Sequence, residues 1–198
     1  MRYVLGIGTN VGDRKENIDK AIKAIELLPQ TKIVLKSSIY ETQPVGYDEQ
    51  QDFYNICVEV QSIFNPYEMI GAVLGIEAGF GRVRSIKDGP RIIDIDIIFA
   101  ENIVIETRNL TTPHPRYKER RFVLEPLMEL YPDGHFYGYS FYGLSEKIEN
   151  QAIKKLYKIR RELTRLIFLE KLNFNSKISI LYIYLFCKQY YCTKVQRR

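Results

Sequence analysis

The 198-residue sequence has few of the residues that build thiolate metal sites or disulfide frameworks. It contains three cysteines, an odd number, and Cys57, Cys187 and Cys192 show no zinc-binding spacing. No apolar stretch approaches the roughly 20 residues needed to cross a bilayer. Residues 1–4 have the pattern of a strand and not of a signal peptide. These absences argue against a membrane or disulfide-rich secreted protein and favour a reducing, cytoplasmic location.

Charge is distributed unevenly along the chain. Residues 1–150 have 17 basic and 22 acidic side chains, a net −5, whereas residues 151–198 have 12 and 2, a net +10. The positive net charge therefore gives no reason to expect nucleic-acid binding by the first 150 residues. The length suits one core with an appendage, so we expect a catalytic domain over 1–155 and a basic C-terminal extension of unknown role over 156–198.

Hydrophobic periodicity predicts an alternation of strands and helices. Residues 13–28 have helical spacing, and Asn65-Pro66-Tyr67-Glu68 begins a second helix with a capping side chain, a first-turn proline and a glutamate. Strands are expected over 2–8, 33–40, 53–63 and 92–99, with loops over 42–52 and 79–91. The order βαββαβ predicts a ferredoxin-like α+β sandwich with an antiparallel sheet.

The strand over 92–99 is the most informative segment. Asp94 and Asp96 are two residues apart, so their carboxylates point to one face, about 6.5–7 Å from each other. Two like charges this close repel unless a cation lies between them, and carboxylate oxygens suit Mg²⁺. A solvated outer face of an antiparallel sheet is an equally supported alternative. The residues expected to point the other way, into a core, are Ile93, Ile95, Ile97 and Phe99.

Cationic residues flank this strand. Arg91 precedes Asp94 by three residues, and Arg82 and Arg84 lie just upstream. Guanidinium groups beside two carboxylates suit a polyphosphate with Mg²⁺, because arginine binds phosphate oxygens in bidentate fashion. His114 lies between two prolines and before arginines at 116, 120 and 121. A single histidine is more often structural, but these neighbours favour phosphate contact.

Several short segments of residues 1–155 share a distinctive order and spacing: residues 8–14, 40–46, 52–55, 77, 81–84, 89–96 and 113–122. Together these segments resemble the 6-hydroxymethyl-7,8-dihydropterin pyrophosphokinase family of folate biosynthesis. It implies a ferredoxin-like core with added helices. It also implies transfer of the β,γ-pyrophosphoryl unit of ATP to the pterin hydroxymethyl group, with release of AMP.

The resemblance assigns roles to individual residues. It implies two Mg²⁺ ions held by Asp94 and Asp96, and a stacking pair, Phe53 and Phe122, around a pterin whose edge meets Asn55. Taken alone, the two phenylalanines would more often be core residues, and Glu77 would be a solvated helix residue. The implied catalytic residues are Arg82, Arg84, Arg91, Asp94, Asp96 and His114. The implied ATP-binding residues are Glu77, Arg82, Arg84, Arg91, Ile97, Thr111, His114 and Arg120. The implied pterin-binding residues are Thr42, Pro44, Val45, Phe53, Asn55 and Phe122.

One departure from the family concerns the 79–91 loop, which is shorter by one residue and has Asp88 where an aromatic lid is common. The basic C-terminal extension over 156–198, the tail, is a second departure from the family. Leu156, Ile159, Leu163, Leu166 and Ile167 have the spacing of one amphipathic helix, and residues 178–187 fit a strand or a buried segment. The tail is an element packed on the domain, a basic surface-binding appendage, or an extension without function.

Two other functions stay open. RNA-binding domains share the βαββαβ order, although two carboxylates on the sheet would repel a phosphate backbone. The chain could also bind pterin and nucleotide without turnover. We expect a monomer whose partners are ATP and hydroxymethyldihydropterin, with no membrane and no nucleic-acid partner.

Overall fold

The computed structural model describes residues 1–81 and 89–157. They belong to one compact unit, Met1–Ile159, and the second unit, Arg160–Arg198, lies outside the described residues. Within the described part, no helix is both long and apolar enough to span a membrane. The longer elements are β1 (Arg2–Thr9), α1 (Arg14–Glu26), β2 (Lys32–Lys36), β3 (Ile39–Thr42), β4 (Phe53–Gln61), α2 (Pro66–Gly79), β5 (Asp94–Ala100), α3 (Arg121–Leu130) and β10 (Ile153–Tyr157). The short ones are β6 (Ile105–Glu106), β7 (Thr111–Thr112), η1 (Tyr117–Glu119), β8 (His135–Phe136), β9 (Tyr139–Ser140) and η2 (Ser145–Lys147).

The two predicted helices begin where the sequence places them. The Asp13 side chain accepts the N–H of Glu16 at 2.9 Å and caps α1. In α2, Asn65 accepts the N–H of Glu68 at 3.0 Å, and the Glu68 carboxylate accepts the N–H of Asn65 at 2.7 Å. Both caps satisfy backbone donors that have no acceptor inside the helix. The predicted helix starts are confirmed.

The main sheet pairs antiparallel throughout. Its strand order is β10-β3-β4-β1-β5, and β2 pairs with β4. β1 therefore lies between β4 and β5, in the interior of the sheet. The combination of helices with an antiparallel sheet confirms the predicted α+β class.

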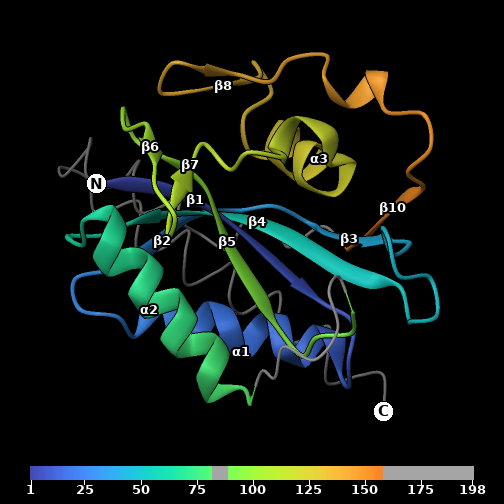
Figure 1. The fold of residues 1–198 in the computed structure, drawn as a ribbon, viewed down its shortest axis with the longest axis horizontal. Helices are drawn as coiled ribbons and strands as arrows, with labels where there is room; N and C mark the ends of the chain where they lie inside the picture. The colour runs from blue at the N-terminus through green and yellow to red at the C-terminus, as the bar shows by residue number, and fades with distance from the viewer. Residues whose placement is uncertain (82–88, 158–198) are drawn as a thin grey trace, which may run out of the picture. The chain divides into compact units, whose positions relative to one another are not determined.

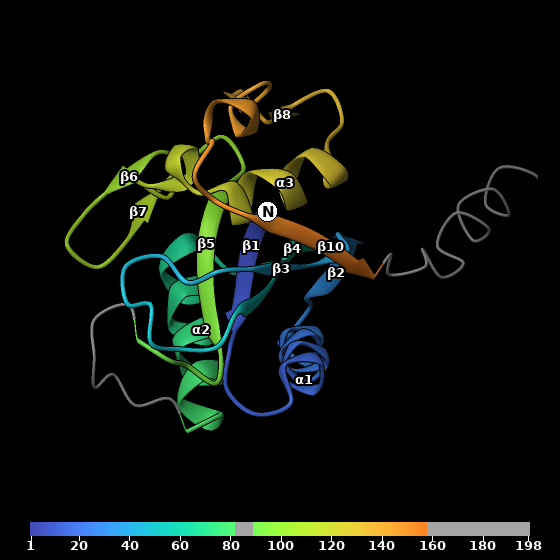
Figure 2. The same ribbon diagram turned by 90° about the vertical axis from the view of Figure 1, so that its right-hand side faces the viewer.

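Helices cover both faces of this sheet. Figure 1 shows α1 and α2 on one face and α3 on the other, and Figure 2 shows the same layers after a quarter turn. Leu5 and Ile7 of β1 lie in the core beside α1 and α2, whereas Val4 lies in the core beside α3. Since strand side chains alternate, Gly6 and Gly8 are on the same face as Val4. At positions 6 and 8, that face of β1 therefore has no side chain.

A bulge in β5 overturns one sequence prediction. Leu5 pairs with Ile97 and Val4 with Phe99, so one extra residue, Ile98, stands in β5 between them. An extra residue reverses the alternation of side chains beyond it. Ile97 accordingly lies in the core beside α1 and α2 as predicted, but Phe99 lies in the opposite core. The prediction that Phe99 shares the Ile97 face is wrong.

The residues before 158 overturn the start of the predicted tail helix. Ile153–Tyr157 forms the strand β10, which pairs with β3, and Leu156 packs against the core beside α1 and α2. An unpaired strand edge offers backbone donors and acceptors that a following segment satisfies by adding a strand. The remainder of the predicted helix, and residues 178–187, lie outside the described residues. The boundary at 155 stays a prediction.

A carboxylate of α3 joins α3 to the β3–β10 edge. Glu129 accepts from the Ser38 N–H and hydroxyl, both at 2.9 Å, and from the Tyr40 hydroxyl at 3.0 Å. It also pairs with Lys155 Nζ at 3.1 Å. Burial alone would raise the pKa of Glu129, but these donors outweigh burial and lower the pKa.

We expect Glu129→Gln to destabilise the protein at neutral pH by about 1–3 kcal/mol, because buried donors lose a charged acceptor. The depressed folded-state pKa of Glu129 gives stability above the unfolded pKa, and that stability is lost as the pH falls through the folded pKa. Wild-type melting temperatures should therefore fall more steeply than those of the variant below about pH 4.5. Circular dichroism melts across acidic pH would show this. The exposed Glu146→Gln is the control, and parallel wild-type and Glu129→Gln profiles would contradict the expectation.

Candidate active site

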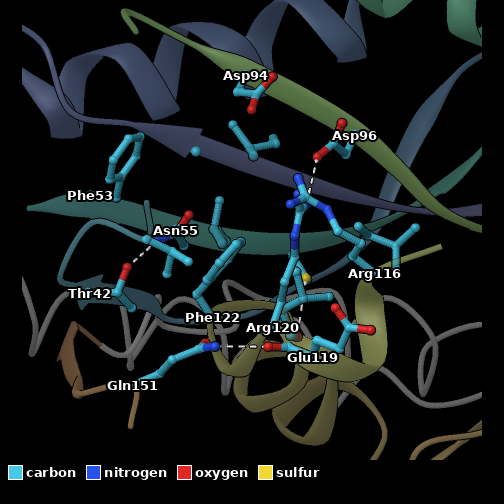
Figure 3. A pocket seen from close by; sticks show the side chains of 18 of the residues that line it. Thr42, Phe53, Asn55, Asp94, Asp96, Arg116, Glu119, Arg120, Phe122 and Gln151 are labelled. Atoms are coloured by element: carbon cyan, nitrogen blue, oxygen red, sulfur yellow. Dashed lines mark hydrogen bonds and ion pairs between the residues drawn. The ribbon is translucent and has the colours of Figure 1, made fainter. Parts of the chain in front are cut away.

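A cavity of about 330 Å³ opens on the α3 side of the sheet. Its floor comes from β1, β4 and β5, and its walls come from the loop after β3, from Arg91 and from residues around the start of α3 (Figure 3). The cavity brings together residues that are far apart in the sequence. Nine predicted site residues line it: Thr42, Val45, Phe53, Asn55, Arg91, Asp94, Asp96, Arg120 and Phe122.

Asp94 and Asp96 both line the cavity from β5, as the strand alternation predicts (Figure 3). Each lies opposite a glycine of β1, because Asp94 pairs with Gly8 and Asp96 with Gly6. A β-carbon on Gly8 would lie 3.0 Å from Asn55 Oδ1, and one on Gly6 would lie 3.1 Å from a side chain of β5. Any larger residue at these positions would fill the cavity floor. The two glycines therefore keep the space in front of the carboxylates open.

Arginine side chains pair with both carboxylates. Arg91 Nη1 lies 2.6 Å from Asp94 Oδ2, and Arg120 Nη1 lies 3.4 Å from Asp96 Oδ2. Burial lowers the pKa of Arg120, and Asp96 opposes this shift. A guanidinium stays charged at any physiological pH. Arg91 and Arg120 are thus positioned to bind anionic oxygens in the cavity.

His114 lies beside Asp96 and Arg120. Its Nε2 is 3.9 Å from Asp96 Oδ2 and 3.4 Å from Arg120 Nη1. Burial, together with Arg120 and Arg116, lowers the pKa of His114 to about 4. Nδ1 accepts the N–H of Arg116 at 3.1 Å, which assigns the proton of the neutral ring to Nε2. Two donors, His114 Nε2 and Arg120 Nη1, thus converge, an arrangement that suits an anionic oxygen between them.

Two aromatic rings and an amide form another part of the cavity (Figure 3). The Arg91 guanidinium lies 5.3 Å from the centre of the Phe53 ring, and that of Arg120 lies 5.5 Å from the centre of the Phe122 ring. Asn55 Nδ2 donates to the Thr42 hydroxyl at 2.8 Å, which holds the amide in one orientation. A flat ligand with a hydrogen-bonding edge matches this combination.

Asn10 connects the segments around the cavity, a role that the sequence analysis did not assign. Its N–H donates to the Arg91 carbonyl at 3.1 Å, and its Oδ1 accepts the Arg91 N–H at 2.8 Å. Its Nδ2 donates to Gln50 Oε1 and to the Gln51 carbonyl, at 2.8 and 3.0 Å. The side chain is buried. It therefore ties the loop before β4 to the backbone of Arg91.

Several residues that line the cavity are not among the predicted site residues. Arg116 and Glu119 line the cavity from the segment before α3, and Gln151 lines it from the segment before β10. Arg116 and Glu119 lie inside the 113–122 motif, so their place in that motif could have indicated that they line the site. Gln151 lies in no motif, and only the fold places it here.

Several predicted residues lie elsewhere. Glu77 is buried at the end of α2, where Oε1 accepts the N–H of Ile95 at 2.7 Å, so its interpretation as a solvated residue is wrong. Ile97 is buried in the core beside α1 and α2, and Pro44 lines a small hollow next to the cavity. Thr111 begins β7 and is not among the cavity-lining residues. Arg82 and Arg84 lie outside the described residues. Nucleotide contact by Glu77, Ile97 and Thr111 stays a prediction.

The protein is of the α+β class, and the cavity on its sheet brings arginine side chains next to two aromatic rings, a combination that suits an anionic group beside a flat ring. The chain belongs to the 7,8-dihydro-6-hydroxymethylpterin-pyrophosphokinase (HPPK) family, whose model matches residues 4–132.

Two curated relatives have the same name, 2-amino-4-hydroxy-6-hydroxymethyldihydropteridine pyrophosphokinase. The Bacillus subtilis protein is 40% identical over 126 residues, which cover 64% of this chain and 75% of that protein. The Methylorubrum extorquens protein is 37% identical over 132 residues, which cover 67% and 84%.

Among solved structures, the HPPK-DHPS protein of Plasmodium falciparum is similar, with a TM-score of 0.52 and 19% identity. The match covers 74% of this chain but only 43% of that one. At this identity the likeness concerns the fold alone.

Proposed function

We propose that this chain transfers the pyrophosphoryl unit of ATP to 6-hydroxymethyl-7,8-dihydropterin in folate biosynthesis, giving AMP and the pterin diphosphate. Family membership supports this reaction, and ATP is the co-substrate of the family.

One observation in the cavity carries the proposal. Each of two arginines contacts both a carboxylate and an aromatic ring: Arg91 joins Asp94 to Phe53, and Arg120 joins Asp96 to Phe122. A transfer from a polyphosphate to a flat heterocycle needs this junction, because the phosphates and the ring have to meet at one point. Phosphoryl transfer asks little covalent chemistry of the protein beyond positioning and charge stabilisation.

The ring would lie between Phe53 and Phe122, with Asn55 at its hydrogen-bonding edge. Arg91, Arg120 and the Nε2–H of His114 would bind phosphate oxygens, and we infer the same for Arg82 and Arg84. Because its pKa is about 4, His114 would act as a neutral donor and not as a cation at pH 7.

We infer that Asp94 and Asp96 hold Mg²⁺, with two ions expected. Their donor set fits, because Mg²⁺ takes one or two carboxylates and completes its coordination with phosphate and water oxygens. Gly6 and Gly8 on the cavity floor leave room in front of the two carboxylates. Among residues 1–81 and 89–157, no group of three or more acidic, histidine or cysteine side chains could hold a metal, so the remaining ligands would come from substrate and water. When bound, the metal would neutralise charge on the triphosphate.

Three further features belong to this proposal: the arrangement of the strands, the oligomeric state and the location of the protein. If β2 and β3 are taken as one interrupted strand along β4, the core order is βαββαβ, which favours the ferredoxin-like arrangement. We keep the monomeric state and a reducing location as expectations. The reducing location rests on the odd cysteine count of the sequence, and Cys57 is a free, buried thiol.

The test combines purified full-length protein, ATP, Mg²⁺ and hydroxymethyldihydropterin, with nucleotide products separated by chromatography. We expect AMP and pterin diphosphate in equal amounts, and loss of both when EDTA removes the metal. ADP as the product would indicate an ordinary kinase. Tight RNA binding without any nucleotide product would favour the RNA-binding alternative, and substrate binding without turnover the third one.

A further inference from the structure

Gln151 reaches the cavity from outside the family motifs. It lies just before β10 and beyond residues 4–132, which match the family model. It nevertheless lines both the cavity and the small hollow beside it. Figure 3 shows its side chain directed toward Glu119, next to Arg120 and Phe122.

The Gln151 side chain forms hydrogen bonds with the residues on both sides of Arg120. Gln151 Nε2 donates to the Glu119 carbonyl at 2.8 Å, and Gln151 Oε1 accepts the N–H of Arg121 at 2.8 Å. The Gln151 carbonyl also accepts from Arg121 Nη1 at 3.3 Å. The backbone immediately before and immediately after Arg120 is thus held by one residue of the C-terminal segment.

The bond to Arg121 has the geometry of a helix cap. The first N–H groups of a helix have no acceptor inside it. In α3 the N-cap residue is Arg120, which makes no side-chain capping bond. Gln151 provides the missing acceptor from a position 30 residues away in the chain. The start of α3, where Phe122 lies, therefore depends on Gln151 for its cap.

The same segment also holds the opposite wall. Ile153 of β10 pairs with Thr42 of β3, and the Thr42 hydroxyl accepts from Asn55 in the cavity. Within three residues, the chain from Gln151 to Ile153 thus reaches the Asn55 side and the Phe122 side of the space assigned to the ring.

We propose that Gln151 is a positioning residue of the active site. It fixes the backbone around Arg120 and caps α3, so that Arg120 and Phe122 face the substrates before they bind. The inference rests on the proposed function, since the ligand used to test it is the pterin. It also means that residues C-terminal to the family match complete the site.

The test uses two full-length variants. Gln151→Met keeps the length of the side chain and removes both of its hydrogen bonds. Gln151→Glu keeps the acceptor for the Arg121 N–H but has a carboxylate oxygen in place of the Nε2 group that donates to the Glu119 carbonyl. We expect Gln151→Met to raise the pterin Kd and KM about 5–20-fold, below the ~100-fold cost of a full 1 Å misplacement. Gln151→Glu should give an intermediate increase, and kcat should change less than KM in both variants.

Lys154→Ala is the matched control, because Lys154 is exposed on β10, three residues after Gln151, and is not among the cavity-lining residues. It should keep wild-type affinity, and a wild-type melting temperature in at least one Gln151 variant separates positioning from unfolding. Wild-type pterin affinity in both Gln151 variants would overturn the inference, as would an equal loss in Lys154→Ala. If the wild-type protein itself neither binds pterin nor forms AMP, the proposed function fails first, and that result is distinct from failure of the Gln151 role.

Discussion

Asp96→Ala is expected to reduce AMP formation by about 10³-fold or more while leaving the fold intact. Asp96 is one of the two β5 carboxylates that line the cavity, and it lies next to the converging donors of His114 and Arg120. Its removal takes away a metal ligand. It also leaves the positive charge of Arg120 without the Asp96 carboxylate at the place where the phosphates would be positioned. The Asp96 side chain is 41% exposed and 3.4 Å from Arg120, so its loss should cost little stability. Chromatography of the products and a melting curve measure the two effects separately.

Two further variants make this result decisive. Asp96→Asn keeps the shape of the side chain and removes its charge, so it should lose AMP formation to a similar extent. Glu106→Ala removes an exposed carboxylate away from the cavity and should behave as wild type. AMP formation at the wild-type rate in Asp96→Ala would refute the metal assignment. Inactivity accompanied by loss of the folded state would leave the decision to Asp96→Asn.

Phe122→Ala is expected to weaken pterin binding about 10–100-fold, because stacking on an aromatic side chain contributes roughly 1–3 kcal/mol. ATP affinity should fall by no more than about threefold, since Arg120 stays in place and loses only its contact with the ring. The selectivity of the effect distinguishes a stacking role from general damage to α3. Titration of the pterin fluorescence and a separate titration with an ATP analogue provide the two affinities.

Tyr142→Ala is the control for this substitution, because it removes an aromatic side chain that is 68% exposed and not among the cavity-lining residues. It should bind both substrates as wild type does. Unchanged pterin affinity in Phe122→Ala would refute the stacking assignment. Equal losses for pterin and ATP would indicate instead that Phe122 acts mainly by packing.

Residues that are close in the chain were predictable. Asp94 and Asp96 share a face because a strand alternates, and the starts of α1 and α2 follow from caps within three residues. The family motifs also foretold that Phe53, Asn55 and Phe122 would line one cavity.

Residues whose position depends on distant partners were not predictable. Phe99 faces the other core because β5 adapts to β1 through a bulge, and Leu156 is in a strand because β3 offers an edge. Glu77 is buried because its carboxylate accepts a backbone N–H of β5. None of these partners is a near neighbour in the chain, so no local sequence pattern predicts these contacts.

Local sequence was sufficient for the α+β class, the helix starts, the pair of acids on one strand face and the family. Alternation, capping and short motifs operate over a few residues and survive in any context that keeps the segment folded. Long-range packing alone placed Asn10 and Gln151 around the cavity and left space over Gly6 and Gly8 for a ligand. Such contacts exist only after strands and loops far apart in the chain have come together, because their hydrogen-bond partners are set by the three-dimensional arrangement and not by spacing.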